Sequence, residues 1–301
     1  ACEHGGEGEM DSAHRLETGA GILVMECVSE QHYRQGSPLT IQQAKLCLAA
    51  AADLLAAAWQ DEALLRHVEQ RLSRASFHLS VRNPKELAGM EAAWEHFAAA
   101  FREHLEQAGL LGRAVTSLGK RIKECAKHIS NQVSPSPTGA YCTITHGDYK
   151  AMNVFLPRAD VEDNGNAPAL LVDYASTGIG LGMGDVAMHI HHAVRPQDLA
   201  NGGEESLVNF YLDELNQRLE AQGKPRYGKD VAWRHYRYSV VDYGRFIMGR
   251  FWKVATPEAF EKKKNSKNTT LVNRDVAAAM AYVDRIERYL TEIEAEINDG
   301  T

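Results

Sequence analysis

A section of short strands interrupts an otherwise helical chain and limits the folds that the chain can adopt. Apolar runs at residues 141–145, 153–156 and 170–173 are typical of buried strands, because each is short and bounded by polar residues or glycine. A polar hairpin tip at residues 160–166 separates the second run from the third, and a glycine-rich loop at residues 178–184 follows. The pattern predicts a small β region held within a helical protein.

Helical periodicity covers most of the remaining chain. Thr40 followed by Gln43 has the pattern of a capping box at the start of the first helix. A Ser-Pro-Ser-Pro break at residues 134–139 ends the first helical block, and a Lys-rich loop at residues 262–268 separates the last two helices. The predicted helices cover residues 40–59, 62–74, 85–108, 112–131, a stretch from about 185, 204–222, 229–254 and 272–297. The fold class is therefore α+β with helices in the majority.

Composition and charge exclude several classes of protein. The 301 residues are 44% hydrophobic, which excludes a disordered chain, and their net charge of −7 argues against a general nucleic-acid binder. The most apolar stretch, residues 44–59, carries Lys45 and Asp53 and is too short and too charged to cross a bilayer. We expect neither a nucleic-acid nor a membrane partner, and the sequence leaves the oligomeric state open.

The five cysteines indicate a reducing compartment. Their number is odd, their spacings are wide and no C-x-x-C motif occurs, so neither a disulfide framework nor a zinc site is predicted. Reduced thiols of this kind are typical of the cytoplasm, which is the location that we expect.

The loop after the first central strand carries side chains suited to phosphoryl transfer. This reaction needs a carboxylate at the attacking hydroxyl, oxygen ligands for Mg²⁺ and positive charge near the moving phosphoryl group. Asp148 supplies the carboxylate, and Lys150 supplies a cation two residues later. Asn153 and Asp173 offer oxygen ligands of the hard type that Mg²⁺ prefers. The D-x-K-x-x-N spacing is that of a protein-kinase catalytic loop.

Three motifs in this order resemble those of the aminoglycoside phosphotransferase and choline-kinase-like group, including its ecdysteroid-kinase-like branch. They are H-G-D-x-x-x-x-N at residues 146–153, V-D-Y at 172–174 and G-D-V-A at 184–187. The resemblance extends over residues 141–190 and, more weakly, over residues 22–60. It implies a protein-kinase-like fold and transfer of the γ-phosphate of ATP, with Mg²⁺, to a hydroxyl of a small molecule.

The resemblance also implies a role for each matching residue. Asp148 matches the catalytic base, and Asn153 and Asp173 match the metal ligands. His146 matches the residue that packs beneath the catalytic loop, and Asp185 matches the aspartate that buttresses this loop. We assign His146 and Asp185 to the ATP-binding part of the site. Asp185 also suits the N-cap of the helix that follows, and the two roles are compatible.

The N-terminal region matches this group only in part. The apolar run at residues 21–28 predicts a buried strand, in which Met25, Glu26 and Cys27 resemble the hinge that meets the adenine of ATP. Residues 1–20 contain no lysine and no apolar strand pattern. The resemblance implies a phosphate-covering loop and a strand lysine in the small lobe, and neither is visible.

We therefore divide the chain into two unequal parts. Residues 1–30 are expected to be the remnant of an N-terminal lobe with the hinge strand. Residues 31–301 are expected to form a mostly helical C-terminal lobe. The two interpretations of the short N-terminal part are an incomplete chain and a degenerate kinase.

Two other functions remain open at this stage. A pseudokinase or binding module would retain the loop residues but transfer no phosphate. A protein kinase is less favoured, because Asp173 is followed by Tyr-Ala and not by Phe-Gly, and no A-P-E motif follows. The acceptor could be a sugar, a choline-like amine, an antibiotic or a steroid alcohol.

Two groups of side chains outside the loop have both a structural and a functional interpretation. Three histidines at 189, 191 and 192 are expected to pack on a helix rather than bind a metal, with His191 near the catalytic loop. An aromatic run favours helical core, but it could also line a pocket for a cationic substrate. Its members are Trp233, Tyr236, Tyr238, Tyr243, Phe246, Phe251 and Trp252.

Overall fold

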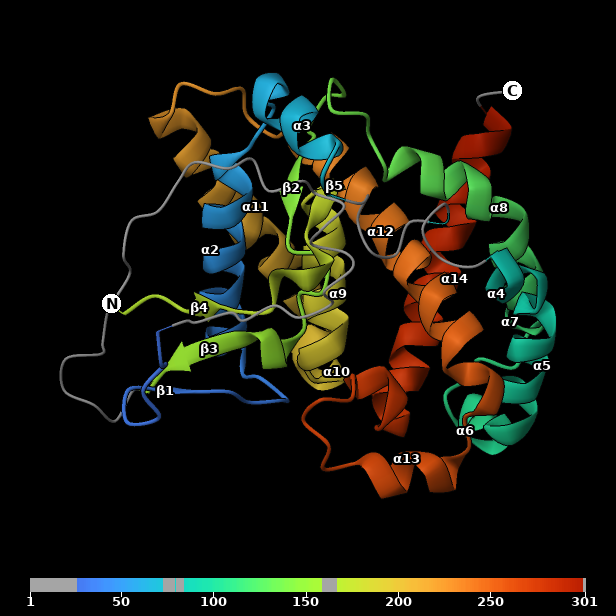
Figure 1. Cartoon of the computed structure of the whole chain (residues 1–301). Helices are drawn as coiled ribbons and strands as arrows, with labels where there is room; N and C mark the ends of the chain where they lie inside the picture. The colour runs from blue at the N-terminus through green and yellow to red at the C-terminus, as the bar shows by residue number, and fades with distance from the viewer. Residues whose placement is uncertain (1–25, 73–78, 80–83, 159–166, 300–301) are drawn as a thin grey trace, which may run out of the picture.

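The computed structural model of the chain describes residues 26–72, 79, 84–158 and 167–299 (Figure 1). Its helices are α2 (Ile41–Ala57), α3 (Glu62–Glu69), α4 (Pro84–Ala88), α5 (Met90–Ala100), α6 (Arg102–Gln107), α7 (Arg113–Thr116), α8 (Leu118–Gln132), α9 (Met183–Ala193), α10 (Pro196–Leu199), α11 (Gly203–Ala221), α12 (Lys229–Arg250), α13 (Pro257–Lys263) and α14 (Val276–Asp299). Its strands are β1 (Tyr33–Arg34), β2 (Thr143–Thr145), β3 (Val154–Pro157), β4 (Leu170–Leu171) and β5 (Gly178–Gly180). The expected mixture of many helices and small sheets is confirmed.

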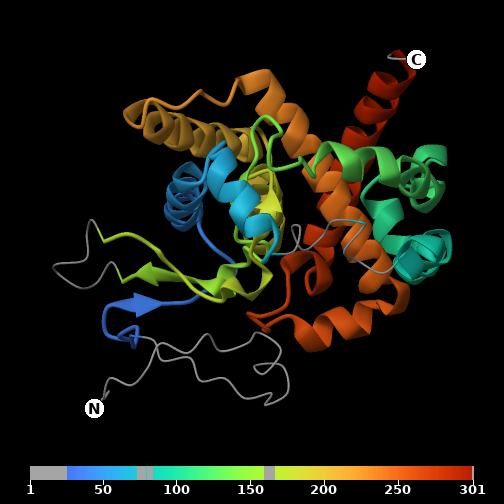
Figure 2. The same cartoon turned by 45° about the horizontal axis from the view of Figure 1, so that its top comes forward.

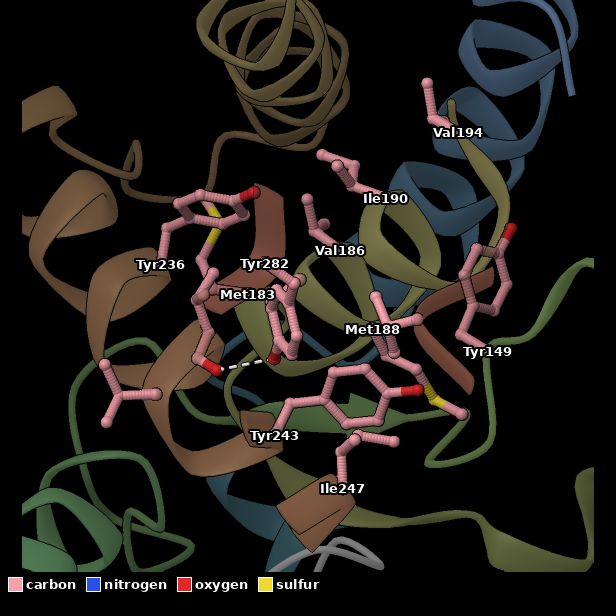
Figure 3. Packing of buried hydrophobic residues seen from close by; sticks show 14 of the residues in the cluster. Tyr149, Met183, Val186, Met188, Ile190, Val194, Tyr236, Tyr243, Ile247 and Tyr282 are labelled. Atoms are coloured by element: carbon pink, nitrogen blue, oxygen red, sulfur yellow. Dashed lines mark hydrogen bonds between the residues drawn. The ribbon is translucent and has the colours of Figure 1, made fainter. Parts of the chain in front are cut away.

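Helix α9 occupies the centre of the molecule. Helices α2 and α12 both pack against it, and α11 packs against α2. The small sheets lie beside α2, whereas α4–α8 lie at the opposite edge, as two views agree (Figure 1; Figure 2). Nearly every residue of α9 is buried, as expected for a helix enclosed by others, and the buried residues include Asp185 and three histidines. Figure 3 shows the side chains of α9 among those of the neighbouring helices.

Two antiparallel sheets frame the loop at residues 146–153. In the first, β3 pairs with β1 on one side and with β4 on the other, with Val154 opposite Leu171. In the second, β2 pairs with β5, with Ile144 opposite Ile179. The loop therefore leaves one sheet and enters the other, and its two ends are fixed by separate sets of backbone hydrogen bonds.

The predicted strands and helices agree with the structure over most of their length. Thr40 caps α2, and its capping box with Gln43 is present. The expected helix at 85–108 is broken into α4, α5 and α6, and that at 112–131 into α7 and α8.

Two expected loops contain regular structure. Lys262 and Lys263 belong to α13, which Thr256 caps with Pro257 in the first turn, so the expected loop at 262–268 begins later than predicted. Gly178–Gly180 forms β5 and is not a glycine-rich loop.

The strand predicted at residues 21–28 is absent from residues 26–28, the part of it that the structure describes. Residues 26–28 belong to no strand, and Glu26 and Cys27 are exposed. Met25 and the rest of that run lie outside the described residues. Within the described residues the first strand is β1, five residues after the end of the expected one, and it pairs with the strand that follows the loop. The role of residues 25–27 at the adenine of ATP stays a prediction.

The four cysteines among the described residues form no disulfide. Cys142 is fully buried, as expected, and burial raises the pKa of its thiol to about 12. Of the described helices, none alone has the length and apolar character to span a bilayer. Only α2 and α3 together, across a 93° bend, meet those criteria.

Candidate active site

Asp185 ties the loop at residues 146–153 to the central helix. Its carboxylate accepts hydrogen bonds from the backbone N–H groups of His146 at 2.7 Å and Gly147 at 2.9 Å. Burial raises the pKa of Asp185 to about 6, against these donors, which favour the ionised form. Gly182 holds the N-cap position of α9, so the N-cap interpretation of Asp185 is wrong. Its position instead matches the expected buttress.

Gly147 is the residue that lets this loop close on its neighbour. It has φ of +77°, a region that favours glycine, and a Cβ added there would lie 2.0 Å from the carbonyl oxygen of Ser176. The close approach brings the loop against the segment after Asp173. Steric exclusion of a side chain at position 147 therefore explains why the H-G-D motif has a glycine there.

Asp148, Lys150 and Asn153 form a single polar cluster. Lys150 Nζ lies 2.6 Å from Asp148 Oδ2. Asn153 Nδ2 donates to the backbone oxygen of Asp148 at 2.9 Å and to Oδ2 at 3.2 Å. These two side-chain hydrogen bonds of Asn153 use its Nδ2 atom, so neither occupies the side-chain oxygen that can ligate a metal. The structure thus brings these three predicted residues together.

Asp173 joins the same region through the backbone. The N–H of Val172 donates to the carbonyl of Asn153 at 3.0 Å, so Asp173 follows directly beside the end of the loop. Asp173 is exposed and has φ of +65° and ψ of +64°, the left-handed conformation that few residues other than glycine adopt. Backbone strain of this kind is concentrated at functional sites.

His146 and His189 support the loop from below. His146 is fully buried and its Nε2 lies 2.9 Å from the carbonyl oxygen of Val172, which links the loop to the strand before Asp173. His189 Nδ1 lies 3.2 Å from the carbonyl oxygen of Tyr149. The contact with the loop expected of His191 is therefore made by His189. His191 instead lies 3.5 Å from Glu204.

A cavity of about 420 Å³ opens beside Asp148 and Lys150. We name it the α9–α12 cavity. Its wall combines side chains of α9, α12, α13 and residues 268–273. The apolar members include Met188, Tyr243, Phe246, Ile247, Phe251, Val254 and Phe260. Figure 3 shows Tyr243 of α12 pointing toward Met188 of α9.

The aromatic run divides between this cavity and the core. Tyr243, Phe246 and Phe251 line the cavity, whereas Tyr236 and Trp252 are fully buried and do not. Asp148 is the only carboxylate among the described residues on the wall, which also carries Lys150, Arg250 and Lys263. The acidic groups that a cationic substrate would need are therefore missing from this wall.

The sequence matches the ecdysteroid kinase-like family over residues 11–224, more than half of the chain. The chain belongs to this family. The family is part of the protein-kinase-like superfamily of small-molecule kinases, which accords with the motifs at residues 146–153, 172–174 and 184–187. A comparison with curated proteins finds no match.

Members of this superfamily generally use ATP and Mg²⁺, and the donor set fits such a metal. The described residues contain no group of three or more His, Cys, Asp or Glu side chains that could enclose a metal ion. Magnesium at phosphoryl-transfer sites takes only one or two protein oxygens and completes its shell with phosphates and water. An amide oxygen from Asn153 and a carboxylate from Asp173 suit that requirement.

Sequence reasoning missed the parts of the site that come from distant segments. Ser176, the residues of α13 and the segment 268–273 carry no motif. His192 was expected to pack on its helix, and the structure also places it on the wall of the cavity.

Proposed function

We propose that this member of the ecdysteroid kinase-like family transfers the γ-phosphate of ATP to a hydroxyl of a neutral, largely apolar small molecule in the cytoplasm. The observation that carries the proposal is the cluster of Asp148, Lys150 and Asn153, in which Asp148 and Lys150 line a cavity with aromatic side chains in its wall.

Asp148 is the base in this proposal. Lys150 and Asn153 both donate to Oδ2, which leaves Oδ1 as the oxygen for the acceptor hydroxyl. As the acceptor oxygen forms its bond to the γ-phosphorus, the bond between that phosphorus and the bridging oxygen of ADP breaks. The hydroxyl proton passes to Asp148.

Lys150 and a metal ion held by Asn153 and Asp173 would neutralise negative charge on the phosphates. The Lys150 ammonium contacts the Asp148 carboxylate and would therefore lie near the oxygens of the phosphoryl group during its transfer. Asn153 and Asp173 would hold Mg²⁺, which supplies charge neutralisation at the phosphates. His146 and Asp185 keep the loop in the geometry that these side chains need.

The cavity supports the choice of acceptor. Burial of apolar surface against Tyr243, Phe246 and Phe251 favours an apolar skeleton. With one carboxylate on the described wall, already engaged by Lys150, a choline-like amine or an aminoglycoside would lack counter-charges. A steroid or terpenoid alcohol fits these properties better than a sugar.

The test is acceptor-dependent turnover. The chain is incubated with ATP, Mg²⁺ and a panel of neutral alcohols, and ADP release and the phosphorylated product are measured, the product by mass spectrometry. We expect product with one or more apolar alcohols and none with choline or kanamycin. Nucleotide binding without turnover on any alcohol would favour the binding-module interpretation instead.

A further inference from the structure

We propose that His192 is a positioning residue that binds a second oxygen-bearing group of the acceptor, close to the hydroxyl that is phosphorylated. The inference rests on the proposed function, because it concerns the acceptor in the α9–α12 cavity. It assigns a specificity role to a histidine that no motif marks.

The first observation is a buried histidine with one unpaired ring nitrogen. His192 is 3% exposed, and its Nδ1 atom has no hydrogen-bond partner among the described residues. Buried polar atoms in native proteins are usually paired, and an exception calls for a ligand or a water that would satisfy it. Of the other two histidines of α9, His191 contacts Glu204. His189 contacts the Tyr149 carbonyl through Nδ1, and its Nε2, like Nδ1 of His192, has no partner among the described residues. Of His189 and His192, His192 is the one that lines the cavity.

The second observation is the place of His192 in the site. It forms part of the wall of the cavity that also contains Asp148 and Lys150. On α9 it follows His189 by three residues and so lies on the same helix face, one turn beyond the contact with the loop. A group bound by His192 is therefore a neighbour of the hydroxyl at Asp148.

The surroundings of His192 define the chemistry of that group. The charged and titratable groups that act on it are His189, Arg274 and Lys150, none of which is a carboxylate. Together with burial, they lower its pKa to about 3, so the imidazole is neutral. A neutral imidazole has one donor and one acceptor nitrogen, which a hydroxyl can match because it can both donate and accept.

The first experiment compares the stability of two variants. His192→Phe replaces a ring whose Nδ1 atom is unpaired with an apolar ring, whereas His189→Phe removes a hydrogen bond to the loop. We expect the Tm of His192→Phe to equal or exceed that of the unaltered chain, and that of His189→Phe to fall. If His192→Phe loses as much Tm as His189→Phe, His192 holds the fold and the proposal is wrong.

The second experiment uses estriol and estradiol, which differ by one hydroxyl adjacent to the 17-hydroxyl. With ATP and Mg²⁺, we expect kcat/KM for estriol to exceed that for estradiol by roughly tenfold or more, the effect of one hydrogen bond. In His192→Phe the ratio should approach one through a higher KM for estriol. His192→Asn introduces an amide, which can also donate and accept a hydrogen bond, and should recover part of the ratio. A His192→Phe variant that retains the full ratio would overturn the assignment.

The two experiments separate this proposal from the one on which it rests. If the unaltered chain phosphorylates neither steroid, while choline or a sugar is phosphorylated, the proposed acceptor class fails. The unfolding comparison still decides whether His192 is an unpaired side chain or a structural one.

Discussion

The loop at residues 146–153 and the α9–α12 cavity lie side by side but are held differently. In the loop, Asp148, Lys150 and Asn153 bond to one another, and Asp185 fixes the backbone before them. In the cavity wall, apolar side chains from several helices surround polar groups such as His192 that lack a partner among the described residues. The contrast indicates that the catalytic side chains are preorganised, whereas polar atoms of the cavity wall obtain their hydrogen-bond partners only when the acceptor binds.

The largest effect is expected from Asp148→Asn. Loss of the base should lower kcat by about 10²–10⁴-fold. Nucleotide binding should be nearly unchanged, because Asp148 contacts the acceptor and not ATP in the proposed arrangement. Steady-state rates and calorimetric ATP titration measure the two properties. Asp213→Asn, an exposed change on α11, is the matched control, and full turnover by Asp148→Asn would remove the base from the account.

The second effect tests the preorganisation of the loop. Asp185→Ala leaves the N–H groups of His146 and Gly147 without their acceptor. Each buried unpaired donor costs about 1–3 kcal/mol, so the free energy of unfolding in urea should fall by a few kcal/mol. Asp185→Asn retains an acceptor oxygen and should lose less. Equal stability of all three proteins would mean that the loop is held by other contacts.

The third effect concerns pH and α9. Burial lowers the pKa of His189 to about 4 and that of His192 to about 3, against about 6.5 in an unfolded chain. Between these values the unfolded chain binds more protons, so stability is present above pH 6.5 and is lost as the pH falls. At pH 5 the loss is on the order of 2 kcal/mol for each histidine.

Asp185 opposes this loss. Its pKa of about 6 lies above the ordinary value of an aspartate, so at pH 5 the folded chain binds this proton more tightly than the unfolded chain does. This protonation stabilises the folded chain at low pH, and the stabilisation is lost as the pH rises through 6. Its size at pH 5 is about 1 kcal/mol, less than that of either histidine. Burial also lowers the pKa of His191 and His235, which adds a loss of the same sign as the pH falls. Urea unfolding at pH 7.5 and pH 5.0 measures the total. His192→Phe should reduce the change in the free energy of unfolding between the two pH values. An unchanged difference would show that burial does not lower the pKa of His192.

The smallest effect is expected at the rim of the cavity. Phe251 lines it and is 41% exposed, so Phe251→Ala removes contact with the acceptor and little core packing. We expect KM for an apolar alcohol to rise by roughly tenfold, with a stability change below about 1 kcal/mol. Leu64→Ala on α3 changes a similarly exposed side chain away from the cavity and serves as control. Equal KM values in both variants would place the acceptor elsewhere.

The same contrast explains what the sequence could predict. The loop residues lie within eight positions of one another, so their spacing alone indicates a common site. The cavity is assembled from residues between 148 and 273, and no local pattern relates Met188 to Phe260. A run of lysines predicts a solvated loop, and this prediction fails at α13 because Thr256 and Pro257 are signals for the start of a helix.

The histidines of α9 show a finer limit. Their spacing predicts which of them share a helix face, but only the packing of α9 against the loop decides which one faces Tyr149. The loop contact expected of His191 is made by His189 for this reason. The exposure of Glu26 and Cys27 has a related origin, because an apolar run predicts burial only where a partner surface covers it.

The most direct test of the account is a thermal-shift titration of the chain with ATP, with and without Mg²⁺. ATP at about 100 times its Kd should add roughly 2.7 kcal/mol of stability. We predict a rise in Tm that requires Mg²⁺ and that Asp173→Ala abolishes, with Asp213→Ala as control. A rise that is equal without Mg²⁺, or that persists in Asp173→Ala, would contradict the metal site at Asn153 and Asp173. The absence of any rise would contradict ATP binding by this chain.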